Sequence, residues 1–368
     1  MDRYQLLVGA AEFWTSAARD VGRARRRVLV QAMTFEGDAA GLAVAEAILA
    51  ATASDRRVLV DDYTRHVVSD CRLPPPLRPA QVSAEARTTK AMFDRLTTGG
   101  VGVRITNPVG RNPLRFPLRN HKKSLVIDDV CYVGGINFSD HNFAWHDLML
   151  RIDDAAAADF LAADFARDWA GEPQSAAGRF DRLTLLTLDG ETNEATLAPV
   201  LELLSGARRS IEMVCAYPTL PFVAAMERAV RAGAQATIYT AGPSNKPIVR
   251  DYLAATAPAA GIELRLLPEM THAKAVLIDR EVLAMGSVNF NFASYRTNGD
   301  ILALSEDPAL IAAFEARVLA PARRSARAPL PGETALWRRW RARLALTLAD
   351  ALLPRLRHSR PRIGPWPR

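Results

Sequence analysis

Short apolar runs alternate with longer amphipathic stretches along most of the chain. Apolar runs of roughly four to eight residues are typical of buried strands, whereas apolar residues spaced by three and four predict helices. The proline-rich residues 71–79 are predicted to form a loop, and residues 171–181 a linker. Before the linker the pattern predicts strands at 25–33, 56–62 and 101–106, a strand pair at 124–135, and helices at 41–53, 85–96 and 155–169.

The same order of elements returns after the linker. Alternating strands and helices predict an α/β fold whose sheets are covered by helices. The repetition predicts two pseudo-symmetric halves, residues 1–172 and 182–322, each a mixed β-sheet flanked by helices. The expected elements are strands at 208–217, 235–240 and 262–267, a strand pair at 275–287, and helices at 220–231 and after residue 247.

Each half carries one copy of the pattern HxKxxxxD, followed by small residues, an asparagine and a carboxylate. One copy arises by chance in roughly one such chain in two hundred, and two matching copies are far rarer. By subtraction, the first four pairs lie 151 positions apart, the asparagines 152 and the last aspartates 153. The members are His121, Lys123, Asp128, Gly135, Asn137 and Asp147 in the first copy, and His272, Lys274, Asp279, Gly286, Asn289 and Asp300 in the second.

Lysine is rare in this chain, which has five lysines and 42 arginines. Lys123 and Lys274 nevertheless follow the motif histidines, and a compact ammonium does not replace a planar guanidinium, so the choice indicates a constrained site. Residues i and i+2 of a strand share a face, so each histidine points with its lysine, and pseudo-twofold packing brings both pairs to one cleft. Two imidazoles and two ammoniums supply a nucleophile, an acid and charge stabilisation for phosphodiester chemistry. The alternative is that each pair only begins a strand at a solvated edge.

These residues resemble the double HKD signature of the phospholipase D superfamily. The first motif is most similar to the bacterial cardiolipin synthases, because NHKKSLVID, VGGIN and Trp145-His146-Asp147 match their NHRK, VID, VGGIN and WRD-type elements. The resemblance implies two phospholipase D-like halves with the active site at their interface. It also implies that His121 attacks phosphorus to form a covalent phosphohistidine, while His272 acts as acid and then as base.

The resemblance implies roles for the other motif residues as well. Asp147 and Asp300 orient a motif histidine and favour its charged form. Asp128 and Asp279 close the motifs at a strand turn, either as turn residues that cap a hairpin or in a chemical role. The second motif departs from the family at three positions, where Asn291, Ala293 and Asp300 replace the usual Asp, Arg and Glu. The resemblance also implies which side chains bind the nonbridging phosphate oxygens, namely Lys123, Lys274, Asn137 and Asn289.

Composition narrows the class of partner. The formal net charge of +7 and the pI of about 9.6 indicate an acidic partner: anionic lipid, nucleic acid or a phosphorylated substrate. Three cysteines without CxxC spacing indicate reduced thiols in a cytosolic chain. The paired motifs need no cofactor, and no carboxylate cluster suited to a divalent metal is evident. No apolar run approaches the roughly 18 to 20 residues of a membrane-spanning helix.

The basic C-terminal segment, residues 323–368, is predicted to contain an amphipathic helix at 333–353. Arginines flank an apolar stripe whose members are Trp337, Trp340, Leu344, Leu348 and Leu352. Such a helix suits an anionic membrane surface. The alternatives are that the stripe packs on the protein's own core or that the arginines bind nucleic acid.

The leading hypothesis is a monomeric phosphatidyltransferase or phospholipase D that acts on phospholipids. It is expected to be cytoplasmic and peripheral to the inner face of the cell membrane. The alternative is a nuclease or another phosphodiesterase acting on nucleic acid, and a catalytically inactive binding protein is disfavoured because both motifs are complete. The histidines outside the motifs are expected to be structural or exposed; they are His66, His141, His146 and His358.

Overall fold

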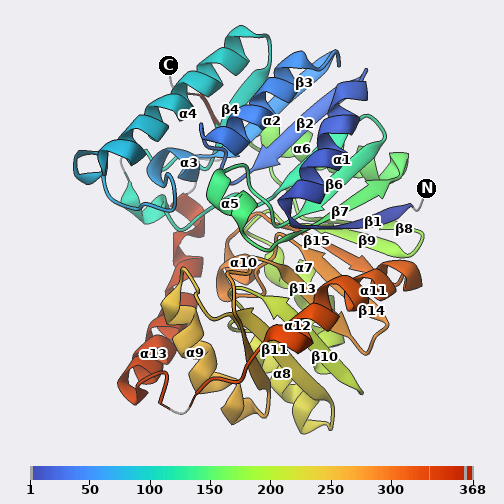
Figure 1. Ribbon diagram of the computed structural model, residues 1–368, viewed down its shortest axis with the longest axis vertical. Helices are drawn as coiled ribbons and strands as arrows, with labels where there is room; N and C mark the ends of the chain where they lie inside the picture. The colour runs from blue at the N-terminus through green and yellow to red at the C-terminus, as the bar shows by residue number, and fades with distance from the viewer. Residues whose placement is uncertain (1–2, 111, 331, 360–362, 367–368) are drawn as a thin grey trace.

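The computed structural model describes residues 3–110, 112–330, 332–359 and 363–366. They form two halves, which Figure 1 shows one above the other, the first in blue to green and the second in light green to red. Each half contains an eight-stranded mixed sheet flanked by helices. The predicted α/β fold with two pseudo-symmetric halves is therefore confirmed.

The two sheets share one strand order. Seven strands of each sheet occupy equivalent positions, with three parallel strands on one side and four antiparallel strands on the other. The first sheet consists, in spatial order, of β1 (Tyr4–Val8), β7 (Leu148–Asp153), β6 (Val130–Gly134), β5 (Ser124–Ile127), β2 (Arg27–Ala32), β3 (Asp55–Asp61), β4 (Gly102–Thr106) and β16 (Ile363–Pro365). The second consists of β8 (Ala176–Phe180), β9 (Leu183–Thr187), β15 (Ile301–Ser305), β14 (Val282–Gly286), β13 (Lys274–Ile278), β10 (Ser210–Cys215), β11 (Gln235–Ala241) and β12 (Glu263–Leu267).

Helices connect the strands and cover the sheets (Figure 1). The five helices predicted from periodicity before α13 all form, with ends that differ by a few residues. The first half contains α1 (Gly9–Arg23), α2 (Ala39–Ala50), α3 (Tyr63–His66), η1 (Pro75–Leu77), α4 (Ala80–Thr98), η2 (Pro113–Arg115), α5 (Asp140–Ala144) and α6 (Ala155–Ala170). The second contains α7 (Asn193–Ser205), α8 (Phe222–Arg231), α9 (Pro247–Thr256), η3 (Pro258–Ala260), α10 (Phe292–Arg296), α11 (Pro308–Phe314), η4 (Glu315–Leu319), α12 (Ala320–Ser325), α13 (Leu336–Leu352) and η5 (Leu353–Ser359).

Local signals in the sequence set the ends of helix α6. The Asp154 side chain accepts a hydrogen bond from the backbone N–H of Ala157, which satisfies one of the free donors of the first turn. At the other end Gly171 adopts φ 81°, a left-handed conformation that glycine takes without steric cost and that stops the helix. The helix thereby places Asp164 and Asp168 behind the first motif.

The structure corrects two boundaries. Residues 171–181 were predicted as a linker, but Ala176–Phe180 form β8, which pairs with β9 at the edge of the second sheet. Residue 323 lies inside helix α12, so the C-terminal segment does not begin at a structural break. This segment also returns to the first half, because β16 pairs with β4.

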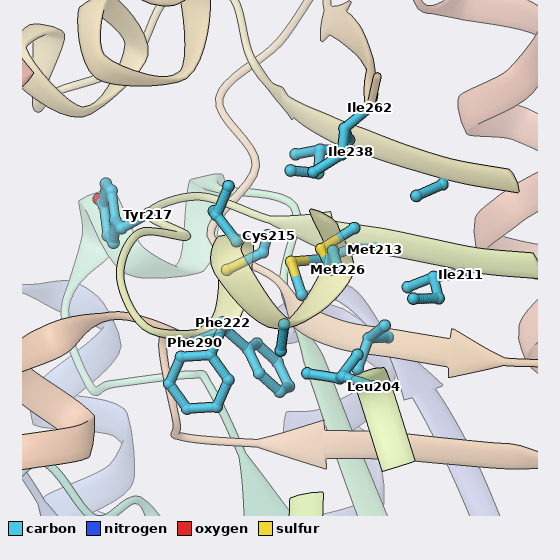
Figure 2. Close-up of a cluster of buried hydrophobic side chains, with 14 of the residues drawn as sticks. Leu204, Ile211, Met213, Cys215, Tyr217, Phe222, Met226, Ile238, Ile262 and Phe290 are labelled. Atoms are coloured by element: carbon cyan, nitrogen blue, oxygen red, sulfur yellow. The ribbon is translucent and has the colours of Figure 1, made fainter. Parts of the chain in front are cut away.

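Buried apolar side chains form three clusters. One lies in each half, and the third joins residues of both halves between the two sheets. Figure 2 shows the cluster of the second half, in which Met213, Met226 and Phe222 pack together while Tyr217 stands at its margin. Because residues of both halves pack in the third cluster, the two halves share part of their hydrophobic core. None of the helices in the described ranges is both long and apolar enough to cross a membrane.

Candidate active site

The two motifs meet where the halves join, and backbone hydrogen bonds hold them there. The N–H of His121 donates to the carbonyl of Gly299 at 2.7 Å, and the N–H of His272 donates to the carbonyl of His146 at 2.7 Å. Each motif histidine is thereby bonded to the segment that carries the other half's downstream carboxylate. The predicted position of the motifs at the interface is confirmed.

The carboxylates are exchanged between the halves. His121 Nδ1 lies 2.8 Å from Asp300 Oδ1, and His272 Nδ1 lies 2.7 Å from Asp147 Oδ2. All four side chains are buried. A carboxylate can only accept, so each Nδ1 carries the proton and each Nε2 of a neutral histidine is left as a free base. The sequence pattern did not say which aspartate faces which histidine.

The small residues before each asparagine touch these carboxylates. A Cβ atom on Gly135 would lie 2.2 Å from Asp147 Oδ1, so the close approach requires glycine. In the second half Ser287 Oγ donates to Asp300 Oδ1 at 2.6 Å. The structure therefore pairs Gly135 with Ser287, and Gly134 with Gly286, rather than Gly135 with Gly286.

The correction follows from the hairpin turns. Strands β5 and β6 are joined by two residues, Asp128 and Asp129, because Ile127 pairs with Val130. Strands β13 and β14 are joined by three residues, because Ile278 pairs with Val282. One extra turn residue changes the spacing between the halves from 151 to 152 after the turn.

The motif lysines lie beneath the histidines and are almost fully buried. Lys123 Nζ donates to the carbonyl oxygen of His121 at 2.6 Å, and Lys274 Nζ donates to that of His272. Lys274 Nζ also lies 3.7 Å from Asp147 Oδ2. Burial and mutual repulsion lower the pKa of Lys123, and burial lowers that of Lys274. An anion between these ammoniums would relieve the repulsion.

Burial and nearby ammoniums also act on the histidines. Burial, followed by the charge of Lys123, lowers the pKa of His121 to about 4. Burial and the charges of Lys274 and Lys123 lower the pKa of His272. Near neutral pH the His121 imidazole is therefore neutral, with its proton on Nδ1, which is the form in which its Nε2 is a nucleophile.

A pocket opens above the two histidines. Asn137 and Asn289, predicted to bind phosphate oxygens, both line it, and the buried Oδ1 of Asn289 has no hydrogen-bond partner among the described residues. Two of the three departures from the family pattern line the same pocket, since Asn291 and Ala293 are both part of its wall. Asn291 still caps helix α10, because its Oδ1 accepts from the N–H of Ser294 at 2.9 Å.

Asp128 and Asp279 lie outside the pocket at the hairpin turns. Asp128 accepts from the N–H groups of three consecutive residues, Arg25 to Arg27, at 2.8 to 3.0 Å. Asp279 accepts from the equivalent residues, 208 to 210, at 2.7 to 2.9 Å. Both residues adopt positive φ, near 50°. Of the two roles left open by the sequence, the structure supports turn stabilisation, which corrects their grouping with the catalytic residues.

Further aromatic residues line the pocket, among them Trp145, Tyr217 and His141. The ring of Trp145 lies 5.3 Å and that of Tyr217 lies 5.8 Å from the His272 ring, and His141 packs edge-on against Trp145. His141 was expected to be structural or exposed; it lines the pocket and contacts Ser139 and Asn142 through its ring nitrogens. Its position four residues after Asn137, equivalent to Ala293 after Asn289, is the signal that could have identified it.

The remaining histidines fit the expectation in part. His66 lies 3.3 Å from the carboxylate of Asp62, and His146 is hydrogen-bonded to Thr271 at 3.2 Å. The side chain of His358 lies outside the described residues.

One carboxylate cluster was not evident in the sequence. Single oxygens of Glu36, Asp38 and Glu85 lie within 4.8 Å of one another, and Glu36 also lines the pocket. Burial raises the pKa of Glu36 to about 9, so this side chain is protonated near neutral pH. A protonated carboxyl is a poor metal ligand but a good hydrogen-bond donor.

Comparison with known proteins places the chain in a family. The family described as "Cardiolipin synthase, PLD-like domain" matches residues 18–169 and 200–319. Cardiolipin synthase A of Pseudomonas aeruginosa is 24% identical over 343 residues, which cover 86% of this chain and 66% of that protein, just under two thirds of its length. Cardiolipin synthase B of Escherichia coli K12 is 24% identical over 334 residues, covering 81% of this chain and 75% of that protein.

Solved structures share the fold over nearly the whole chain. The phosphatidylserine synthase of Haemophilus influenzae superposes with a TM-score of 0.71 at 15% identity, covering 96% of this chain and 95% of that one. The polyphosphate kinase of Porphyromonas gingivalis gives a TM-score of 0.59 at 13% identity, covering 95% of this chain and 56% of that one. The family match spans well over half of the residues and includes both motifs, so the chain belongs to the cardiolipin synthase family of phospholipase D-like proteins.

Proposed function

We propose that this protein is a cardiolipin synthase-like phosphatidyltransferase that works through a covalent phosphohistidine. The observation that carries the proposal is the pair of crossed His–Asp contacts, each beside a buried lysine, at the base of one pocket. This arrangement offers two histidine Nε2 atoms to one phosphate group and two ammoniums to its charge. The relatives named cardiolipin synthase support the lipid substrate.

In the proposed first step, His121 Nε2 attacks phosphorus and the bond to the leaving alcohol breaks. Asp300 holds the Nδ1 proton and stabilises the positive charge that develops on the ring. His272 gives its Nε2 proton to the leaving oxygen. The anionic phosphate favours the protonated form of His272 and offsets the burial that lowers its pKa. In the second step His272 takes the proton of the acceptor alcohol, whose oxygen displaces His121.

The proposal includes binding to an anionic membrane surface through α13. The apolar stripe does not pack on the core: Trp337, Trp340, Leu344, Leu348 and Leu352 are 44% to 69% exposed. The opposite face of α13 is the one that packs, through Ala342 and Leu346. Because this face lies against α9, the exposed stripe is held rigidly beside the second half (Figure 1). This supports a peripheral location at a membrane, with the inner face of the cell membrane as the proposed site.

The proposal is tested by incubating the purified full-length protein with phosphatidylglycerol vesicles and, separately, with single- and double-stranded DNA. Release of glycerol and formation of a diphosphatidyl product are the expected result, and the His121→Ala protein is the blank. Phosphate-bond cleavage in DNA without any lipid product would favour the nuclease alternative instead. Acid quench of the lipid reaction followed by detection of protein-bound phosphate tests the covalent step.

A further inference from the structure

The pocket contains two cationic side chains that neither motif contributes. Lys246, in the loop before α9, and Arg72, in the loop before η1, both line it. The first comes from the second half of the chain and the second from the first half. They therefore face the same space from opposite sides of the interface, beyond the histidines that would hold the reacting phosphate.

Lys246 has the geometry of a binding residue rather than of a solvated one. Its Nζ lies 4.0 Å from the centroid of the Tyr217 ring, and that ring also contacts His272. Figure 2 shows Tyr217 at the margin of the apolar cluster, which anchors the ring on which the ammonium rests. No carboxylate among the described residues forms an ion pair with Lys246. Burial and the charge of Arg72 lower the pKa of Lys246 to about 8, and the opposing charge of Asp70 offsets only part of this effect.

The loops that carry these cations are linked across the pocket. Tyr217 Oη donates to Asn245 Oδ1, and Asn245 Nδ2 donates to Asp70 Oδ2 at 3.0 Å. Asp70 also lines the pocket, and its carboxylate accepts from the Asn245 amide. The link joins the loop that precedes Lys246 to the loop that precedes Arg72 and ties both to Tyr217, which packs against His272.

The rarity of lysine supports the same assignment. Of the five lysines, Lys123 and Lys274 lie under the histidines and Lys246 lines the same pocket. Lys122 is buried against Asp164 and Asp168, and Lys90 is exposed beside Asp94. Three of the five lysines therefore lie in this pocket or directly beneath its histidines.

We infer that Lys246 and Arg72 form a second anion subsite that binds a phosphate group on the acceptor alcohol. The inference rests on the proposed function and specifies its acceptor. The acceptor hydroxyl oxygen forms a bond to phosphorus, the phosphorus–nitrogen bond of the phosphohistidine breaks, and its electron pair returns to the histidine Nε2. The hydroxyl proton passes to the other motif histidine. The acceptor's own phosphate stays bound at Lys246 and Arg72, one aromatic side chain away from His272.

The test is a competition between acceptors, because partition of one covalent intermediate is independent of the donor. The full-length protein is given unlabelled phosphatidylglycerol in mixed micelles with equal concentrations of carbon-13-labelled glycerol, glycerate and glycerol 1-phosphate, and the labelled lipid products are separated by mass, because transfer to unlabelled glycerol would only regenerate the donor. The expected result is a preference for glycerol 1-phosphate that falls about tenfold in Lys246→Gln and in Arg72→Gln, since charge-assisted hydrogen bonds are lost. Lys246→Arg should retain most of the preference.

Two controls accompany these variants. Lys90→Gln removes an exposed lysine and should leave the product ratio unchanged. Asp70→Asn keeps an oxygen that can accept from Asn245 but removes the negative charge, so the preference for the phosphorylated acceptor should rise. Thermal unfolding of each variant identifies any loss of structure.

The outcomes separate the two proposals. Transfer to alcohols with the same product ratio in wild type and in Lys246→Gln would overturn the subsite and leave the proposed function standing. Equal enrichment of glycerate and glycerol 1-phosphate would overturn the assignment to phosphate. Absence of any alcohol product would overturn the phosphatidyltransferase itself, and the subsite with it.

Discussion

Gly135 and Ser287 occupy equivalent positions in the two halves, yet they make different contacts with the neighbouring carboxylate. Gly135 leaves room for Asp147, whereas Ser287 donates a hydrogen bond to Asp300. Behind the motif the difference is larger, because the first half buries Lys122 between Asp164 and Asp168 and the second half has Ala273 in an apolar core. The halves are alike in the histidines, lysines and asparagines of the motifs and different in the residues that support them. The two motif copies thus match, while each half stabilises its own copy in a different way.

The sharpest test of this comparison replaces each motif histidine. His121→Ala and His272→Ala should each lower turnover by at least about a thousandfold, because nucleophile and acid act as one unit. The two variants should differ in one respect: only the nucleophile variant loses the protein-bound phosphate seen after acid quench. A His272→Ala enzyme with full activity would show that the second half only supports the first.

Substitution of Gly135 or Ser287 is expected to have the next largest effect on turnover. Gly135→Ser should lower turnover by about a hundredfold, because its Cβ would lie 2.2 Å from Asp147 Oδ1 and displace the carboxylate that holds His272. Ser287→Gly removes one buried hydrogen bond to Asp300 and should cost about tenfold. Steady-state rates on a soluble phosphodiester measure both. Equal effects would mean that the two carboxylates are supported in the same way.

The buried cluster of Lys122, Asp164 and Asp168 behind the first motif is tested by measuring the free energy of unfolding. Lys122→Met removes the ammonium between the buried carboxylates of Asp164 and Asp168, leaves only Arg167 at 3.9 Å from Asp164, and should lower the free energy of unfolding by about 3–5 kcal/mol. Urea denaturation at neutral pH measures the loss. The matched control is Lys90→Met at an exposed lysine, where less than about 0.5 kcal/mol is expected. A similar midpoint for the two variants would contradict a structural role for the buried cluster.

The exterior of the halves also differs, since α13 packs against the second half. Trp337→Ser combined with Trp340→Ser should weaken binding to phosphatidylglycerol vesicles by about tenfold or more, because each buried aromatic side chain contributes about 1.5–3 kcal/mol. Both residues are exposed, so the fold should be unaffected. Co-sedimentation measures binding, and Leu203→Ser, at an exposed leucine of α7, is the control. Unchanged vesicle binding in the double variant would rule out the stripe as the contact.

Removal of the whole C-terminal segment is a poorer test of the same surface. Arg338 pairs with the buried Asp251 at 3.0 Å, and Arg296 pairs with Asp350 at 2.8 Å. A cut near residue 323 would break these contacts and expose the α9 face that Ala342 and Leu346 cover. Loss of vesicle binding would then report unfolding as readily as loss of the stripe.

The smallest expected effect concerns the carboxylate cluster of the first half. Excess chelator should leave turnover at neutral pH unchanged, because the crossed histidines and lysines supply the chemistry and Glu36 in the cluster is protonated. The rate is measured on a soluble phosphodiester to separate chemistry from membrane binding. A rate that falls with chelator and recovers with magnesium or calcium would assign the Glu36, Asp38 and Glu85 cluster to a metal.

Much of the fold could be predicted from the sequence because the residues that start and end its elements act locally. The helix at 155–169 formed almost as predicted, since its cap residue Asp154 and its terminal Gly171 act within one turn of the chain. The linker prediction for 171–181 failed because β8 has few apolar residues and is a strand only through its pairing with β9. The C-terminal stripe was recognised from its spacing, but the spacing alone did not say that the opposite face would pack on α9.

The sequence by itself determined the candidate reacting groups, because the duplicated HxK pattern depends on residue type and on the two-residue period of a strand. Only the tertiary structure decided that each histidine is held by the other half's aspartate, as in the contacts of His121 with Asp300 and of His272 with Asp147. It also decided that Lys246 and Arg72 share one pocket. These pairs are separated by 125 or more residues, and no local pattern encodes contacts that arise only when two sheets pack against each other.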